Sequence, residues 1–263
     1  MADPLLEQAL ACVDSFYQRI FRDWPGAVTQ TVGDCTVSYS GDTRLTGANH
    51  IWPQHPNALS EAVLDDATRF FARFHAAWSI VLIDTYMPGW GEWLESGGYY
   101  GRWSTPLMVL TGPPRAVRAN PATRIVTASA PQHIADTGRV MAEAFASGAG
   151  VNNRISRAEH LGASDILHYL AYVDGEPAAC ATIALCGEMA GIWNVGTRYR
   201  FRRQRHATTL MLAVLDDLRA RDIQASMLMA SSAGQPLYEQ LGYRQIGVTT
   251  YYGPPYRPGF SGI

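Results

Sequence analysis

The sequence has no lysine, few cysteines and no long apolar run, and each scarcity excludes a class of protein. All 21 basic residues are arginine, and the net charge of -2 gives no general attraction to nucleic acid or to anionic membranes. The four cysteines, which show no Cys-x-x-Cys spacing, argue against a metal site and a disulfide framework: Cys12, Cys35, Cys180 and Cys186. No stretch approaches the roughly 18 apolar residues of a membrane span. The first residues lack a basic head and an apolar core, so we expect no signal peptide and a cytoplasmic protein.

What the chain does contain is a globular composition with one local cluster of positive charge. Its 263 residues, 47% of them hydrophobic, suffice for one large domain or two modest ones. The cluster holds five arginines: Arg198, Arg200, Arg202, Arg203 and Arg205. A predicted helix over residues 206–221 follows, and a helix N-terminus already carries about half a positive charge. Either the arginines extend into water or an anion binds among them, and the second alternative makes this turn a candidate phosphate site.

Hydrophobic periodicity predicts alternating strands and helices in the second half of the chain. A linker rich in proline and glycine spans residues 110–121. Strands are expected over residues 124–128, 166–173, 178–185, 191–197, 225–230 and 245–252, and helices over residues 131–145, 206–221 and 235–241. This order predicts an α/β fold with a mixed central sheet flanked by helices.

The first half repeats part of this pattern at a constant distance. Glu95 and Gly98 precede Glu239 and Gly242 by 144 residues in each case. A predicted helix over residues 60–77 and a strand over residues 79–84 come before the first copy, as a helix and a strand come before the second. The agreement predicts a tandem, pseudo-duplicated arrangement with domains over residues 1–112 and 122–263.

Three motifs resemble those of the GNAT acetyltransferase superfamily. They are Val195, Gly196 and Thr197 on a strand; Arg202, Arg203, Gln204, Arg205, His206 and Ala207 at a helix start; and Ala230, Ser231, Tyr238, Leu241, Gly242 and Tyr243 after the next strand. The resemblance implies a GNAT-like catalytic domain over residues 122–263 with acetyl-CoA as co-substrate. It also implies a degenerate GNAT-like domain over residues 1–112, in which Leu94 stands at the position of Tyr238 and catalysis is lost.

The helix-start motif departs from the family pattern. The family uses glycines there so that backbone N–H groups close on the pyrophosphate of coenzyme A, but this chain has Arg203 and Arg205. Their side chains either block the ligand or point outward and add guanidinium contacts to phosphate. We expect the second outcome, with a binding set of Val195, Gly196, Thr197, Arg202, Arg203, Gln204, Arg205, His206, Ala207, Thr208 and Ser231.

The resemblance also implies a mechanism in which an amine attacks the thioester of acetyl-CoA. The backbone N–H of Val195 would stabilise the carbonyl oxygen, and Tyr238 would protonate the departing thiolate. Glu188 is the candidate general base, although a glutamate in a turn is more often simply solvated. The weaker candidates for the base are His133, Asp136, Glu143 and His168.

These expectations together predict an N-acetyltransferase that acts on a small-molecule amine, without a nucleic-acid or membrane partner. Two other functions stay open. The fold supports other acyl-CoA chemistry, such as acyl transfer to a carrier-protein thiol or decarboxylation. Alternatively, the chain is a non-catalytic GNAT-like protein that binds a ligand and has lost coenzyme A. The sequence leaves the acceptor and the formation of a homodimer undecided.

Overall fold

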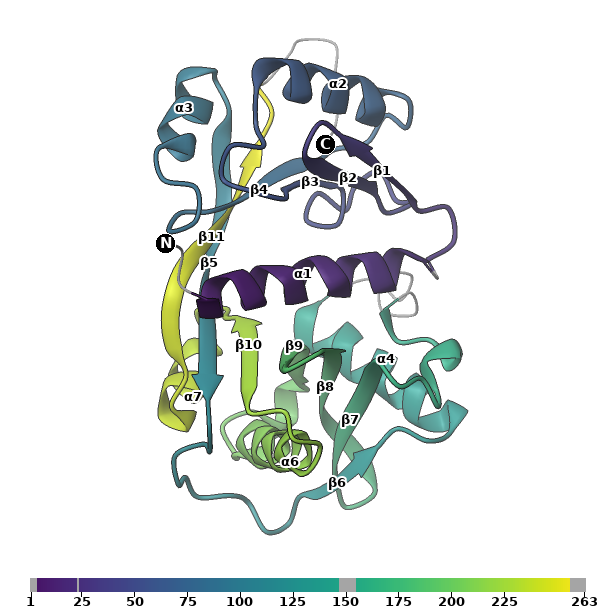
Figure 1. Cartoon of the computed structure of the whole chain (residues 1–263). Helices are drawn as coiled ribbons and strands as arrows, with labels where there is room; N and C mark the ends of the chain where they lie inside the picture. Colours follow the sequence, from purple (N-terminus) through teal and green to yellow (C-terminus); the bar gives the residue numbers. More distant parts are fainter. Residues whose placement is uncertain (1–3, 23, 147–154, 256–263) are drawn as a thin grey trace. The chain divides into compact units, whose positions relative to one another are not determined.

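The computed structural model describes residues 4–22, 24–146 and 155–255 (Figure 1). Internal packing divides the chain into two compact units. Of the described residues, the first unit contains residues 4–6, those from 17 to 107 and those from 245 to 255, and the second contains residues 7–16 and those from 108 to 244. Helix α1 (Pro4–Arg22) therefore contributes residues to both units.

The second unit has a mixed sheet with the strand order β5-β10-β9-β8-β7-β6. Its strands are the end of β5 (Tyr100–Thr111), β6 (Arg124–Thr127), β7 (Ile166–Val173), β8 (Glu176–Cys186), β9 (Met189–Thr197) and β10 (Ala225–Met229). Its helices are α4 (Pro131–Phe145), α6 (His206–Ala220) and α7 (Gln235–Leu241), with short 3-10 turns η1 (Ala158–His160) and η2 (Tyr199–Phe201). Strands β6 to β9 pair antiparallel, whereas β9 and β10 run parallel and are joined by α6.

Successive side chains of β7 point to opposite faces of this sheet, as in any strand. Tyr169 packs in one core with Leu210 of α6, whereas the next residue, Leu170, packs in another with Met141 of α4. Helices α6 and α4 therefore cover opposite faces, as Figure 1 also shows.

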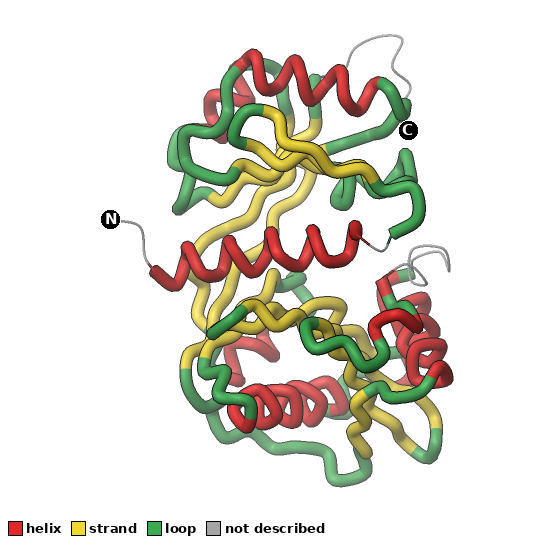
Figure 2. The backbone as a smooth tube through the Cα atoms, turned by 45° about the vertical axis from the view of Figure 1, so that its right-hand side comes forward, coloured by secondary structure: helices red, strands yellow, loops and turns green. Residues whose placement is uncertain are grey.

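The first unit holds the remaining strands of the same 11-stranded sheet, in the order β1-β2-β3-β4-β11-β5. Its strands are β1 (Val28–Val32), β2 (Cys35–Tyr39), β3 (His50–Pro53), β4 (Ser79–Ile83), β11 (Arg244–Gly253) and the start of β5. Strands β3 and β4 run parallel and are joined by α2 (Glu61–Ala72), and α3 (Trp90–Ser96) follows β4. Both units contain strands together with helices (Figure 2).

The turns that end α3 and α7 agree in detail. The N–H of Tyr99 donates to the carbonyl of Leu94 at 3.0 Å, and the N–H of Tyr243 donates to the carbonyl of Tyr238 at 3.0 Å. The glycine before each donor has a positive φ, 82° in the first copy and 102° in the second. The strand after each turn begins 144 residues apart, at residues 100 and 244. The tandem arrangement expected from the sequence is therefore present in the fold.

The last strand of each copy does not stay with the copy that precedes it. Strand β11 follows α7 in sequence but pairs with β4 of the first unit, where Thr249 lies opposite Ile83. The end of β5, which follows α3, neighbours β10 in the second unit. The compact units thus interleave along the chain, and the domain ranges 1–112 and 122–263 stay a prediction.

The expected α/β class and mixed sheet are confirmed. Helices α4 and α7 have the predicted bounds, but α2 ends at Ala72, five residues before the predicted residue 77. The chain leaves the helix because His75 adopts a positive φ of 51°, and this turn buries Ala76 and Trp78. The linker is shorter than predicted, since Leu110 and Thr111 belong to β5.

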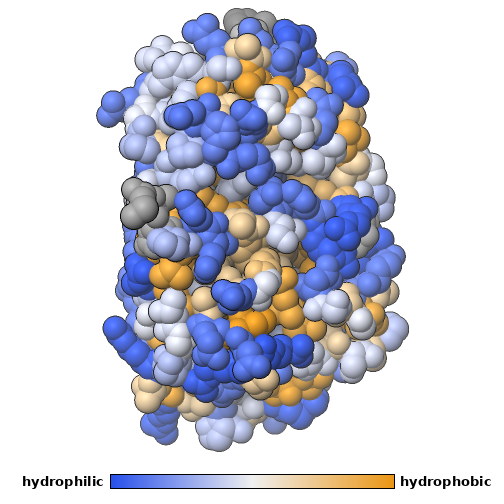
Figure 3. Space-filling view, in the orientation of Figure 1, coloured by the Kyte–Doolittle hydropathy of each residue, from blue (hydrophilic) through white to orange (hydrophobic). Residues whose placement is uncertain are grey.

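The surface is polar over much of the face that Figure 3 draws, with apolar residues in patches between the polar ones. Among the described residues, none of the helices combines the length and the apolar character that crossing a membrane requires.

Candidate functional site

The candidate site lies where β9 and β10 end. Their parallel pairing stops at Gly191 opposite Met227, although both strands continue, β9 to Thr197 and β10 to Met229. Parallel strands that part at their carboxyl ends leave backbone groups available to a ligand. On its other side β9 has a bulge, and the pairing with β8 leaves Asn194 and Val195 without an opposite residue.

The arginine turn, residues 198–205, leaves β9 at this edge and leads into α6. Two of its residues, Arg203 and Arg205, have φ values of 62° and 65°, in the left-handed region that favours glycine. These are the two positions at which the sequence motif departs from glycine. The backbone thus adopts a conformation suited to glycine although arginines stand there.

The N-terminus of α6 has no side-chain cap. Its N-cap residue is Arg205, whose side chain makes no capping hydrogen bond, so the first N–H groups of the helix lack the partner that a Ser or Asp would supply. Both Arg203 and Arg205 are exposed, and neither guanidinium has a hydrogen-bond or ion-pair partner among the described residues. An uncapped helix end with two free cations nearby is suited to a phosphate group.

The other three arginines of the turn are engaged in holding it. Arg198 is 7% exposed and bonds Glu143 at 2.7 Å, and this contact lowers the pKa of Glu143. Arg200 pairs with Glu176. Arg202, predicted as a ligand contact, donates instead to the carbonyls of Thr197 at 3.1 Å and of Ala144 at 2.9 Å.

Residues in and just after the predicted linker also hold the arginine turn in place. Asn120 donates to the carbonyl of Gln204 at 2.8 Å, and its own N–H donates to Thr209 Oγ1. Thr123 Oγ1 lies 2.8 Å from Nδ1 of His206, a buried residue whose pKa is lowered by desolvation. Sequence reasoning missed Asn120 because its partner is 84 residues away and no local pattern signals the contact.

Gly196, a predicted ligand contact, has a packing role that the structure shows directly. A Cβ at this position would lie 2.9 Å from the Cβ of Ala144 and 3.1 Å from Cε2 of Phe145, so only glycine lets α4 approach the strand. Ala207 and Thr208 lie in the first turn of α6, half-buried.

Tyr238 lies on α7, which follows the carboxyl end of β10. Its side chain is 6% exposed, and burial raises the pKa of Tyr238 to about 12. A Cβ at Gly234 would lie 3.4 Å from the Tyr238 hydroxyl and 3.3 Å from Ser231 Oγ, so the structure brings these two predicted residues together. The Ser231 hydroxyl also accepts from the N–H of Gly234 at 3.2 Å.

Glu188 lies away from this group. It is exposed in the turn between β8 and β9, at the end of β9 opposite to Val195. A strand rises about 3.3 Å per residue, so the seven residue steps from Glu188 to Val195 span about 23 Å. Glu188 is therefore distant from Val195, the expected donor to the thioester carbonyl.

The weaker candidates for the general base are held in other hydrogen bonds. His168 is buried between His160 at 3.0 Å and Thr182 at 3.0 Å, and desolvation lowers the pKa of His168 to about 3. Asp136 accepts from the Tyr172 hydroxyl at 2.7 Å.

His133 has a hydrogen-bond partner, and the cysteines form no disulfide among the described residues. His133 Nδ1 accepts from a backbone N–H at 3.1 Å. The four cysteines are free thiols. No group of His, Cys, Asp and Glu side chains within residues 4–22, 24–146 and 155–255 is arranged to hold a metal ion.

One segment of the chain matches the model of a known protein family. Residues 186–246, which hold the arginine turn and Tyr238, match the model of an acetyltransferase (GNAT) domain. No curated protein sequence matches the chain.

Solved structures share the fold over nearly the whole chain. A GCN5-related N-acetyltransferase from Kribbella flavida has a TM-score of 0.75 at 14% identity and covers 95% of this chain and 96% of its own. A GCN5-related N-acetyltransferase from Sphaerobacter thermophilus has a TM-score of 0.66 at 15% identity, covering 97% and 93%. A tandem GNAT protein from the clavulanic acid biosynthesis pathway has a TM-score of 0.69 at 12% identity, covering 97% and 95%. These likenesses establish the fold.

Proposed function

Because the chain carries a GNAT acetyltransferase domain within a tandem GNAT fold, we propose that it is an acyl-CoA-dependent N-acetyltransferase acting on a small-molecule amine. The fold in general supports acetyl transfer from acetyl-CoA. The amine acceptor and the roles of single residues are our proposal, and they rest on the geometry at the ends of β9 and β10.

The positive φ values of Arg203 and Arg205 carry this proposal. A residue with a Cβ in the left-handed region costs roughly 1 kcal/mol, so the turn adopts this backbone at both glycine positions in spite of the side chains. The backbone N–H groups at the start of α6 are thereby left for the pyrophosphate of coenzyme A. The free guanidinium groups would add charge-assisted contacts to the same phosphates.

Tyr238 fits the role of the general acid. Burial raises the pKa of Tyr238 to about 12, so the phenol is protonated throughout the neutral range and its hydroxyl is available as a donor to the departing thiolate. Val195, which has no opposite residue on β8, fits the backbone donor to the thioester carbonyl. Ser231 would hold the ligand beside Tyr238.

The general base is the open part of this mechanism. Glu188 was predicted for it, but its exposed turn lies about 23 Å along β9 from Val195, at 3.3 Å per residue. We therefore assign the proton of the amine to a chain of water molecules leading to solvent. The variant Glu188→Gln tests this assignment, because it should leave turnover and its pH dependence unchanged.

Calorimetric titration with acetyl-CoA tests the proposed function. Binding should release heat and raise the melting temperature, because a ligand that binds only the folded state stabilises it. S-acetyl-pantetheine, which lacks the nucleotide and the pyrophosphate, is the matched control and should bind far more weakly. If a high concentration of acetyl-CoA gives no heat and no stabilisation, the protein is non-catalytic and has lost the ability to bind coenzyme A.

Mass spectrometry of the products then distinguishes the possible reactions. With acetyl-CoA and a panel of small amines, the proposal predicts free coenzyme A and an acetylated amine in equal amounts. Carbon dioxide from malonyl-CoA would instead indicate a decarboxylase. Transfer to a carrier-protein thiol without any amine product would indicate an acyltransferase that acts on a thiol.

A further inference from the structure

Within residues 4–22, 24–146 and 155–255, strand β1 is an edge strand without the usual protection against pairing. It stands last in the strand order of the first unit and pairs on one side with β2. Its sequence, Val28-Thr29-Gln30-Thr31-Val32, contains no charge and no proline, and its first four residues are exposed. Edge strands are normally blocked by charges, prolines or bulges. The edge strand of the second unit, β6, does begin with a charged residue, Arg124.

The hairpin that joins β1 to β2 fixes which backbone groups point outward. The strands are joined by the two residues Gly33 and Asp34, with Val32 opposite Cys35 and a φ of 54° at Gly33. In a two-residue hairpin the residues that flank the turn form a hydrogen-bonded pair, and hydrogen-bonded pairs alternate along the strands. The N–H and C=O groups of Thr29 and Thr31 therefore point away from β2, toward the free edge.

The sequence of β1 reads the same in both directions. Two copies paired antiparallel about Gln30 would place valine opposite valine, threonine opposite threonine, and Gln30 opposite itself. In this register Thr29 of one copy meets Thr31 of the other, so the outward groups of both strands coincide and form hydrogen-bonded pairs. Gln30 falls at the closer, non-hydrogen-bonded position, on the two-fold axis.

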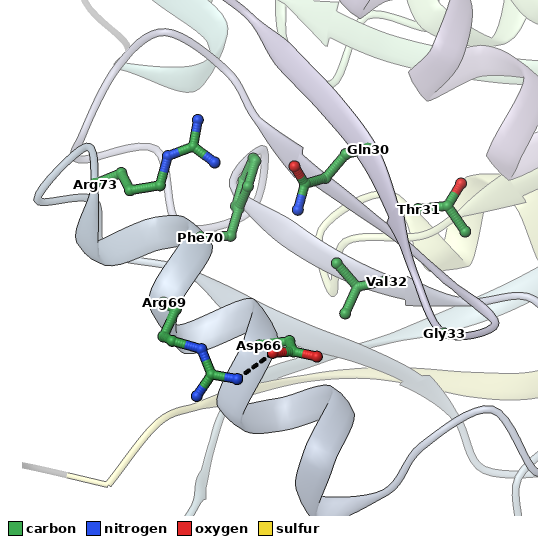
Figure 4. A pocket seen from close by; sticks show the side chains of 8 residues that line it. All are labelled: Gln30, Thr31, Val32, Gly33, Asp66, Arg69, Phe70 and Arg73. Carbon is green, nitrogen blue, oxygen red and sulfur yellow. Dashed lines mark hydrogen bonds and ion pairs between the residues drawn. The ribbon is translucent and has the colours of Figure 1, made fainter.

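The helix above this edge is arranged for the same two-fold axis. A hollow of about 380 Å³ lies between β1 and α2, lined on the helix by Asp66, Arg69 and Phe70 and at its C-cap by Arg73. Figure 4 shows Gln30 facing Phe70 across it. A two-fold axis through Gln30 would bring the α2 helices of the two copies together antiparallel. Asp66 of one copy then approaches Arg73 of the other. The two-fold axis repeats this contact, so two pairs of opposite charge form across the interface.

We propose that the β1 edge, with the Asp66 to Arg73 stripe of α2, is a self-complementary surface that binds a second copy of this chain. The joined β1 strands extend the sheet of the first unit into that of the partner. Because the pairing of five residues is small for a stable interface, the α2 stripes must supply the remaining buried area. This inference is independent of the proposed enzymatic function.

Cross-linking at the axis tests the register directly. In the variant Gln30→Cys the two cysteines would face each other at a non-hydrogen-bonded position, where Cα atoms lie about 4.5 Å apart, within the range of a disulfide. Mild oxidation should give a covalent dimer on a non-reducing gel. The matched control is Gln240→Cys, another exposed glutamine, which should stay monomeric on the gel. Equal cross-linking of the two variants would refute the register.

A charge exchange at the same position tests the interface without covalent chemistry. Sedimentation equilibrium should show the wild-type protein as a dimer. The variant Gln30→Lys places two lysines on the axis and should weaken the dimer by about fivefold, whereas Gln240→Lys should not. An equimolar mixture of Gln30→Lys with Gln30→Glu should recover the wild-type affinity. A monomeric wild-type protein, an unaffected Gln30→Lys dimer or a mixture that does not recover would each overturn the proposal.

Discussion

The chain contains two strand–helix–strand segments, β3–α2–β4 and β9–α6–β10, that differ at the start of their helices. In α2 the hydroxyl of Ser60 accepts from the N–H of Val63 at 3.3 Å, so a side chain of the protein closes the helix end. In α6 the residue at that position is Arg205, in a left-handed conformation and without a capping bond. One helix end is capped by a side chain of the protein, and the other has no side-chain cap.

The helices that follow these segments, α3 and α7, also differ in the polar groups that they carry. Leu94 is fully buried in the core of the first unit, whereas Tyr238, 144 residues later, keeps a hydroxyl beside Ser231 and Gly234. The turns after both residues keep the same hydrogen bonds. The comparison teaches that the backbone of the duplicated element is retained while the chemical groups occur in one copy, as expected if only the second copy binds acetyl-CoA.

The largest effect should come from removing the hydroxyl that distinguishes the two copies. Tyr238→Phe should lower kcat by roughly 10²-fold or more, because the thiolate then leaves without a general acid. Affinity for acetyl-CoA should stay nearly unchanged, since the ring remains. Release of the coenzyme A thiol measures turnover, and calorimetry measures affinity.

The control for this variant is a neighbouring buried tyrosine. Tyr243→Phe removes a hydroxyl that bonds Ser226 at 2.7 Å, and it should cost stability but leave kcat within a few-fold. Equal turnover of Tyr238→Phe and the wild type would remove the proposed chemical difference between the copies.

The next effect concerns a feature that the two units share, a buried neutral histidine. Burial lowers the pKa of His50 to about 4 from an ordinary value of 6.5. A lowered folded-state pKa gives stability that is present above pH 6.5 and is lost as the pH falls toward 4, by about 3 kcal/mol in the free energy of unfolding. Urea unfolding between pH 7 and pH 4 should show this loss, and His50→Gln should flatten it.

The exposed His75 provides the control for His50. His75→Gln should keep the acid slope of the wild type. A slope that is unchanged in His50→Gln as well would assign the acid sensitivity to other groups, such as His168 in the second unit, whose pKa is lowered to about 3.

Much of the second half could be predicted from the sequence because its signals are local. Helix α7 is bounded by Gly234 and Gly242, and α4 begins at Pro131, so both helices have the predicted bounds. The arginine turn was likewise found from charge and position. Strands β1 to β3 were not predicted, since they are short and β1 is exposed along most of its length.

Other features could not be predicted because they depend on contacts distant in sequence. The exchange of β5 and β11 leaves the order of elements unchanged, so no pattern distinguishes it from an unexchanged pair. The left-handed conformations of Arg203 and Arg205 contradict residue preference and depend on the surrounding fold. Glu188 was chosen because the family resemblance implies a glutamate in this hairpin, but a strand of nine residues separates its turn from the arginine turn.

Substitution of the two left-handed arginines sharpens the comparison of helix ends. Arg203→Gly and Arg205→Gly should each raise the free energy of unfolding by about 1 kcal/mol, because glycine tolerates a positive φ. Each should also weaken acetyl-CoA by about tenfold through the loss of a charged contact. Asp222→Gly, at a φ of 63° after α6, is the control that should gain stability without any change in affinity. Tighter binding in the glycine variants would mean that the arginines obstruct the ligand.

The smallest effect should come from opening the closed helix end of the first unit. Ser60→Ala removes the cap of α2 and should lower the free energy of unfolding by about 1 kcal/mol, whereas Ser164→Ala, at another exposed serine, should leave it unchanged. Affinity for acetyl-CoA should not change, because α2 offers no free cation beside its first turn that corresponds to Arg203 and Arg205. If calorimetry of Ser60→Ala showed a second acetyl-CoA site, the cap alone would explain why the first copy does not bind acetyl-CoA. Arg203 and Arg205 would then not be needed for binding.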